Sequence, residues 1–192
     1  MSRTDSRPTL AGRVAVVAAT LVLAGCSSSS PGEGKYPDLT LAETKSPTQL
    51  LRNEAASRIP EEVIEEIVNS TDKSTNCITA ESDPDGLIRS WGSSVRVAIT
   101  AEHGPEVQSL VEDLAQSFVD QGWEKDTFGV DSIIDLASPK SPVSIHVTVS
   151  KADAETGEGG AISLTASGPC VETDGAESDE VKNLEKRAEL EG

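Results

Sequence analysis

Side chains that can act as catalytic bases are scarce in this sequence, which holds only two histidines. His103 precedes a Gly-Pro pair that favours a helix start, and His146 falls on the outward side of a predicted strand. An imidazole titrates near neutral pH and could act as a base. No serine lies in a Gly-x-Ser-x-Gly turn that would activate it. We therefore expect both histidines to be solvent-facing structural residues, and we expect no catalytic residue and no enzymatic activity.

Two acidic stretches carry the oxygen ligands that hard cations prefer. Asp83-Pro84-Asp85-Gly86 is too short for an EF-hand loop, which needs about twelve residues and a closing Glu, so we interpret it as a turn. Asp153, Glu155 and Glu158 flank a Gly-rich turn, where weak calcium binding is an alternative. The chain has no Walker loop, no Gly-x-Gly-x-x-Gly and no His-Glu-x-x-His. We expect no metal site and no cofactor.

Cys26 follows a short apolar run near the start of the chain. Residues 1–13 carry three arginines, and residues 14–24 are apolar or small. This run is shorter than the roughly 20 residues that span a bilayer, and it is typical of a secretion signal. It ends in Leu23-Ala24-Gly25-Cys26, which resembles the lipobox of bacterial lipoproteins, and the chain resembles small lipoproteins of high-GC Gram-positive bacteria.

The lipobox resemblance implies that residues 1–25 are removed and that Cys26 carries a diacylglyceryl group. The protein would then be anchored by lipid to the cell membrane, on its extracytoplasmic face. An ordinary signal with a chance cysteine is the alternative. The resemblance covers about 26 residues and says nothing about the fold of the mature domain.

Two cysteines remain, Cys77 and Cys170, and they form an even pair in a chain expected to be exported. Exported proteins keep disulfides, so we predict a Cys77–Cys170 bond, with two free thiols as the alternative. Cys77 and Cys170 fall at the start of the first predicted strand and just after the last. The bond would therefore place the first and the last strand side by side.

The chain is strongly acidic, with a formal net charge of −17 at pH 7. Such a charge argues against nucleic acid as a partner, because phosphate binding needs a basic surface. It also argues against electrostatic docking on anionic lipid.

Composition divides the chain into four parts. Residues 1–25 are the signal, and residues 26–46 are rich in Ser, Pro and Gly, as in a flexible tether or, alternatively, a recognition segment. Residues 47–171 carry the periodic apolar patterns of a folded domain. Residues 172–192 form an acidic tail that is either disordered or a short helix, which could dock on the sheet or on a partner.

Within the domain, residues 47–69 predict one kinked helix or two short ones, starting at Ser46-Pro47. Residues 105–121 predict an amphipathic helix that Gly122 ends. The predicted strands are 76–80, 87–100, 123–128, 132–138, 143–151 and a last one containing Ile162, Leu164 and Ala166.

Short turns between the late strands favour antiparallel pairing. We expect an α+β fold of two layers, in which helices pack on one face of an antiparallel sheet of about five strands. The other face is rich in Ser and Thr, and it is either solvated or a binding surface.

The sequence favours a non-enzymatic binding or accessory module, held at the membrane through the lipid on Cys26. Its partner would be an envelope or membrane protein and not a nucleic acid. The alternative is a small-ligand or cation-binding lipoprotein that uses the polar face around His146 or the acidic turns. A hydrolase would need a pocket that converges on His103 or His146.

Overall fold

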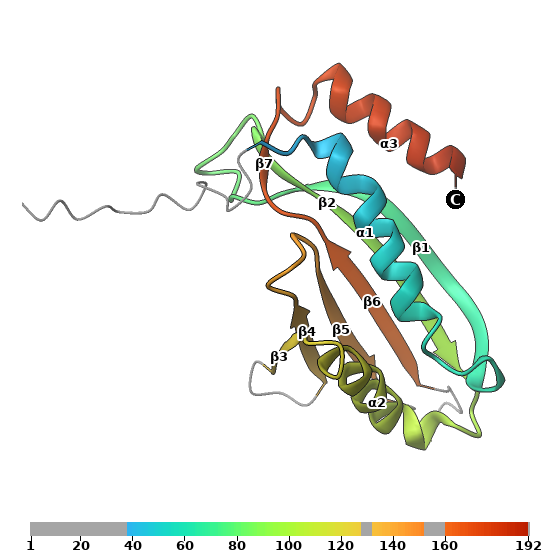
Figure 1. Cartoon of the computed structure of the whole chain (residues 1–192). Coiled ribbons are helices and arrows are strands. Elements are labelled where there is room, and N and C mark those ends of the chain that lie inside the picture. The colour runs from blue at the N-terminus through green and yellow to red at the C-terminus, as the bar shows by residue number, and fades with distance from the viewer. Residues whose placement is uncertain (1–37, 128–131, 152–159, 192) are drawn as a thin grey trace, which may run out of the picture.

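The computed structural model describes residues 38–127, 132–151 and 160–191. These residues form three α-helices and a seven-stranded antiparallel sheet, which confirms the α+β class with more strands than the five expected (Figure 1). The predicted signal, Cys26, most of the tether and the Asp153, Glu155 and Glu158 turn lie outside the described residues.

The sheet order is β1-β2-β6-β5-β4-β3, and β7 also pairs with β2. The strands are β1 (Ile64–Asn76), β2 (Ile88–Ile99), β3 (Glu124–Asp126), β4 (Ile133–Ala137), β5 (Ser144–Ser150), β6 (Ala161–Ser167) and β7 (Val171–Glu172). The α-helices are α1 (Leu41–Ala56), α2 (Val107–Val119) and α3 (Asp179–Glu191), and short 3-10 turns cover Glu61–Val63 and Gly104–Glu106.

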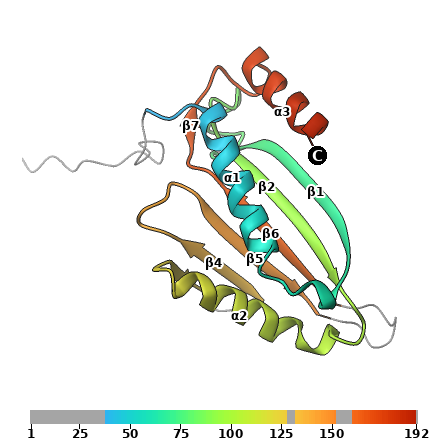
Figure 2. The ribbon, with the colours of Figure 1, turned by 45° about the vertical axis from the view of Figure 1, so that its right-hand side comes forward.

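The main core lies between one face of the sheet and the helices α1 and α2, which both cover that face (Figure 2). Alternation along β2 buries Val95, Val97 and Ile99, as the sequence predicted. Phe118 of α2 is fully buried among them. Gly122 follows α2 with a φ of 87°, a conformation that favours glycine, which confirms it as the helix terminator.

A second, smaller cluster holds α3 against the same face, beside the first turn of α1. Its buried members are Leu41, Trp91, Val171, Val181, Leu184 and Ala188. The sequence left open whether the acidic tail is disordered or a short helix, and in the structure it forms the helix α3. Its weak apolar stripe is docked on the sheet, and this burial stabilises a helix that would be marginal alone.

The start of α1 corrects the predicted tether and helix boundaries. The helix begins at Leu41, so residues 41–46 are not part of a flexible tether, and Pro47 lies inside the helix. The cap is Thr40, whose side chain accepts from the Glu43 amide while the Glu43 carboxylate accepts from the Thr40 amide. This complete capping box outweighs the Ser46-Pro47 signal, and the helix tolerates one hydrogen bond lost at Pro47.

The second half of the predicted 47–69 helix is wrong, because residues 64–76 form the edge strand β1. The apolar residues Val63, Ile64, Ile67 and Val68 have the i, i+4 spacing of a helix, but in the structure this spacing belongs to a strand with two irregularities in its register with β2. Ile67 and Val68 are 63% and 44% exposed and lie outside the core. The predicted strand at 76–80 is wrong as well, since β1 ends at Asn76.

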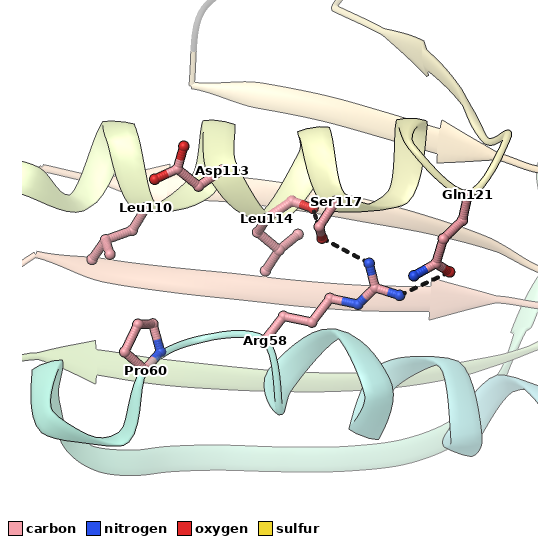
Figure 3. A pocket seen from close by; sticks show the side chains of 7 residues that line it. All are labelled: Arg58, Pro60, Leu110, Asp113, Leu114, Ser117 and Gln121. Atoms are coloured by element: carbon pink, nitrogen blue, oxygen red, sulfur yellow. Dashed lines mark hydrogen bonds between the residues drawn. The ribbon is translucent and has the colours of Figure 1, made fainter.

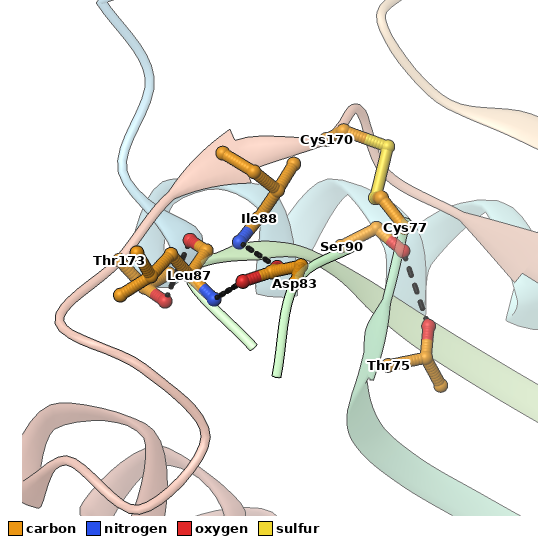
Figure 4. Close-up of a disulfide and its surroundings, with 8 residues drawn as sticks. All are labelled: Thr75, Cys77, Asp83, Leu87, Ile88, Ser90, Cys170 and Thr173. Atoms are coloured by element: carbon orange, nitrogen blue, oxygen red, sulfur yellow. Dashed lines mark hydrogen bonds between the residues drawn. A yellow bond between two sulfur atoms is a disulfide. The ribbon is translucent and has the colours of Figure 1, made fainter. Parts of the chain in front are cut away.

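The disulfide Cys77–Cys170 is present and joins the loop after β1 to the segment before β7 (Figure 4). We expected this bond to place the first and the last strand side by side, and that expectation is wrong. β2 lies between β1 and both β6 and β7, so the bond spans the end of β2. The sequence could not indicate this, because a single bond fixes proximity but not strand order.

Candidate binding surface on the open face of the sheet

The face of the sheet opposite the helices is not covered by any element in the part of the chain that the structure describes (Figures 1 and 2). Its centre is formed by β2, β6 and β5, whose alternate side chains point away from the core. We call this centre the polar face. Its members are Ser90, Ser94, Arg96, Ser144, His146, Thr148, Ser163, Thr165 and Ser167.

The polar face differs from the rest of the molecule in its charge. The chain has 33 acidic residues, yet β2, β6 and β5 contain none. Arg96 and His146 are the ionisable side chains of these three strands, apart from the inward-pointing Arg89. All other members are hydroxyl residues, which both donate and accept hydrogen bonds.

Strand register places polar side chains in rows across the sheet. One row runs through Thr71, Ser94, Thr165, His146 and Asp135, each opposite the next on the neighbouring strand. The hydroxyls of Thr71 and Ser94 lie 2.6 Å apart. Neighbouring strands are spaced about 4.8 Å, so the row is a regular ladder of hydrogen-bonding groups.

Arg96 lies in the next row, between Asn69 and Ser163. Its Nη1 donates long hydrogen bonds to the hydroxyls of Ser150 at 3.3 Å and Ser163 at 3.5 Å. Within residues 38–127, 132–151 and 160–191, its guanidinium makes no ion pair. Its Nε and Nη2 therefore keep donors available for a ligand.

The two histidines are not brought together. His146 Nδ1 lies 2.7 Å from Asp135 Oδ1, and this half-exposed pair forms one end of the polar row. His103 bonds Thr100 Oγ1 at 2.9 Å, just before the 3-10 turn that leads into α2. Thr165 is opposite His146, but in the described chain no hydrogen bond joins them. Among the described residues, the Asp–His pair thus contacts no hydroxyl that it could activate.

A cleft lies on the helical side, between the end of α1 and α2 (Figure 3). Its volume is about 470 Å³, and Pro60, Leu110 and Leu114 supply its apolar lining. Arg58 reaches across one end, donating to Ser117 at 2.7 Å and to Gln121 at 3.1 Å. The Arg58 guanidinium also stacks 3.6 Å from the Phe118 ring centroid. Arg58 therefore links the end of α1 to α2.

Asp83 is a turn residue, as the sequence predicted for 83–86. Its two carboxylate oxygens accept from the amides of Leu87 and Ile88, both at 2.9 Å (Figure 4). These hydrogen bonds, the Ile88 bond first, hold the pKa of the Asp83 carboxyl below its usual range. No group of metal-ligating side chains occurs among the described residues.

Sequence reasoning missed a buried network that fixes α3. Arg89, only 6% exposed, donates to Ser74 Oγ through Nε at 3.0 Å and Nη2 at 2.8 Å. Ser74 in turn donates its hydroxyl and its amide to Glu185 of α3. The only sequence signal was an arginine at an inward position of β2.

Comparison with known proteins returned no matching family model, no similar curated protein and no similar solved structure. In the described ranges, no helix is long and apolar enough to cross a membrane.

Proposed function

We propose that this chain is a lipoprotein held by lipid on Cys26 at the extracytoplasmic face of the cell membrane. The observation that carries this proposal is the sequence Leu23-Ala24-Gly25-Cys26 at the end of a short apolar run. The Cys77–Cys170 bond supports it, because disulfides persist in oxidising compartments outside the cytosol.

Membrane fractionation of a Cys26→Ser variant tests the anchor. Two acyl chains give stable membrane binding, so removing the thiol that carries them releases the protein into the soluble fraction. Ser27→Ala is the matched control, because it changes the adjacent residue and leaves the thiol. If the Cys26→Ser chain stays with the membranes as fully as the control, the proposed anchor is wrong.

The mature domain is proposed to be a non-enzymatic binding module whose binding surface is the polar face. Three adjacent strands carry hydroxyl residues and no acid, together with Arg96, which makes no ion pair among the residues that the structure describes, in a chain that is strongly acidic as a whole. A merely solvated face of such a protein is expected to carry its share of acids. On the flanking strands the same face carries Glu66, opposite Ala98, and Asp135, opposite His146, so the acid-free area is limited to β2, β6 and β5, and we propose this area as the ligand surface.

A sedimentation assay with cell-envelope material from the native host tests this surface. Two variants are compared, and each also carries Cys26→Ser so that an attached lipid does not drive binding. Thr165→Glu adds bulk and negative charge at the centre of the polar face, and it is expected to reduce co-sedimentation severalfold. Ser109→Glu makes the same change on the exposed side of α2. Equal sedimentation of both variants would contradict the assignment.

Binding of a small ligand is the second candidate function, favoured by the cleft between α1 and α2. Its volume of about 470 Å³ lies in the range of small-molecule sites. A ligand that binds there stabilises the folded chain by RT ln(1 + [L]/Kd), so the melting temperature rises with the logarithm of its concentration once that concentration exceeds Kd. Leu110→Trp fills the cleft and is expected to abolish that increase; an unchanged increase would place the ligand elsewhere.

A further inference from the structure

We propose that the polar face binds a carboxylated polysaccharide whose acidic sugars are separated by neutral ones, and that Arg96 binds the carboxylate. This inference rests on the proposed role of the polar face as a binding surface. It adds the chemical class of the ligand and the residue that selects its charge.

The composition of the polar face argues against a protein, a lipid or a nucleic acid as its ligand. Protein interfaces draw their affinity from buried aromatic and arginine anchors, and lipid binding needs exposed apolar side chains. The outward positions of β2, β6 and β5 contain no aromatic ring other than imidazole; the large apolar side chains on this face are Ile88 at the end of β2 and Ile133 of β4, beside Thr148. Nucleic acid needs several cations, and this face offers one arginine.

The hydroxyl side chains match the hydroxyls of sugars. Ser and Thr donate one hydrogen bond and accept others. The hydroxyls of a sugar chain can therefore form hydrogen bonds with this face at several positions of the chain along it. Around Arg96 the neighbours on this face are Ser94 and Ala98 on the same strand, Ser163 and Thr148 in the same row, and Ser150, which accepts a hydrogen bond from Arg96. A flat face of short side chains suits an extended chain more than a compact small molecule.

Arg96 provides the charge selection. Its planar guanidinium can bind a carboxylate through two parallel hydrogen bonds, and such bonds are about twice as strong as neutral ones. Arg52 and Arg58 pair with Asp72 and Glu54, whereas Arg96, like Arg187 of α3 and the buried Arg89, makes no ion pair among the described residues; of these three, Arg96 is the one on the polar face. In a chain of net charge −17, an arginine without a carboxylate partner in the described part of the molecule is suited to one supplied by a ligand.

The net charge also limits how densely charged the ligand can be. One arginine compensates one carboxylate, and the acids elsewhere on the protein repel a dense polyanion. A polymer that alternates acidic and neutral sugars places one carboxylate at Arg96 and hydroxyls over the neighbouring rows. A polyphosphate chain meets repulsion at every further unit.

The test measures binding of three polymers to the purified full chain by fluorescence anisotropy at fixed salt. The probes are hyaluronan, with alternating carboxylated and neutral sugars, dextran, which is neutral, and poly(glycerol phosphate). Hyaluronan is expected to bind about tenfold more tightly than dextran, because a hydrogen bond to a charged group is roughly twice as strong as a neutral one. It is also expected to bind more tightly than poly(glycerol phosphate), whose more closely spaced charges the acidic chain repels. Arg96→Gln is expected to remove that preference, and Arg96→Lys to keep part of it.

Arg187→Gln is the matched control, since Arg187 is exposed on α3 and bonds only the Asn183 carbonyl among described residues. It is expected to leave hyaluronan binding unchanged. Hyaluronan binding no tighter than dextran or poly(glycerol phosphate), or binding unaffected by Arg96→Gln, overturns the inference. If Thr165→Glu still lowers envelope sedimentation in that case, the polar face remains a binding surface and only the ligand class is wrong.

Discussion

Individual carboxylates in this acidic chain have different roles, and Asp83 is the clearest structural one. Its carboxylate is buried and accepts two backbone amides, where a turn would otherwise leave those amides without partners. Such a carboxylate is favoured in its charged form, which is why its pKa is lowered. The sequence Asp83-Pro84-Asp85-Gly86 predicts the turn, but it does not indicate which aspartate accepts the bonds.

The lowered pKa of Asp83 predicts a pH dependence of stability. A carboxyl whose folded pKa lies below its unfolded value of about 3.9 stabilises the fold above that value, and this contribution is lost as pH falls through the folded pKa. Asp83→Asn should lower the melting temperature at pH 7. It should also flatten the decline of the melting temperature below about pH 4. Thermal denaturation of the original chain and of Asp83→Asn measures this. If the melting temperatures of the two proteins fall equally as the pH drops below about 4, this role of Asp83 is contradicted.

At the scale of elements, long alternating patterns were predictable and interrupted ones were not. β2, β5 and α2 follow their periodicities along most of their length, so the sequence places them correctly. β1 contains two irregularities, and its apolar residues therefore mimic a helical repeat. The outward position of His146 was predictable from alternation. The polar row across the sheet was not, because strand order and register depend on pairing between distant segments.

Helix α3 is predicted to owe its order to docking. Leu184 is 4% exposed in the cluster around Trp91, so Leu184→Ala should lower the free energy of unfolding by about 2–4 kcal/mol. Leu50→Ala is the control, because Leu50 is 66% exposed and its truncation should change stability by less than about 0.5 kcal/mol. Chemical denaturation followed by tryptophan fluorescence compares the two, and equal losses would show that α3 is not held by this cluster.

At the scale of the whole molecule, the disulfide links parts of the chain that are far apart in sequence. Cys77 and Cys170 are separated by 93 residues, and they connect the loop after β1 to β7. The pairing was predictable because only two cysteines remain once Cys26 is assigned to lipid. Its place at the end of β2 was not predictable without the strand order.

Removal of this bond should destabilise the molecule strongly. For a loop of 93 residues, the chain-entropy model gives a loss of about 4–5 kcal/mol in the free energy of unfolding. Urea denaturation of the Cys77→Ser, Cys170→Ser double variant measures it. A loss below about 1 kcal/mol would mean that the bond constrains the unfolded chain far less than this model states.

The proposed location of the protein depends on the fate of Cys26, and one measurement addresses it directly. Intact-mass spectrometry of the protein extracted from membranes of its native host gives the first residue and any added group. The account predicts a chain that begins at Cys26 and carries the mass of a diacylglyceryl group or more. A chain that begins at Met1, with an unmodified Cys26 thiol, would contradict it.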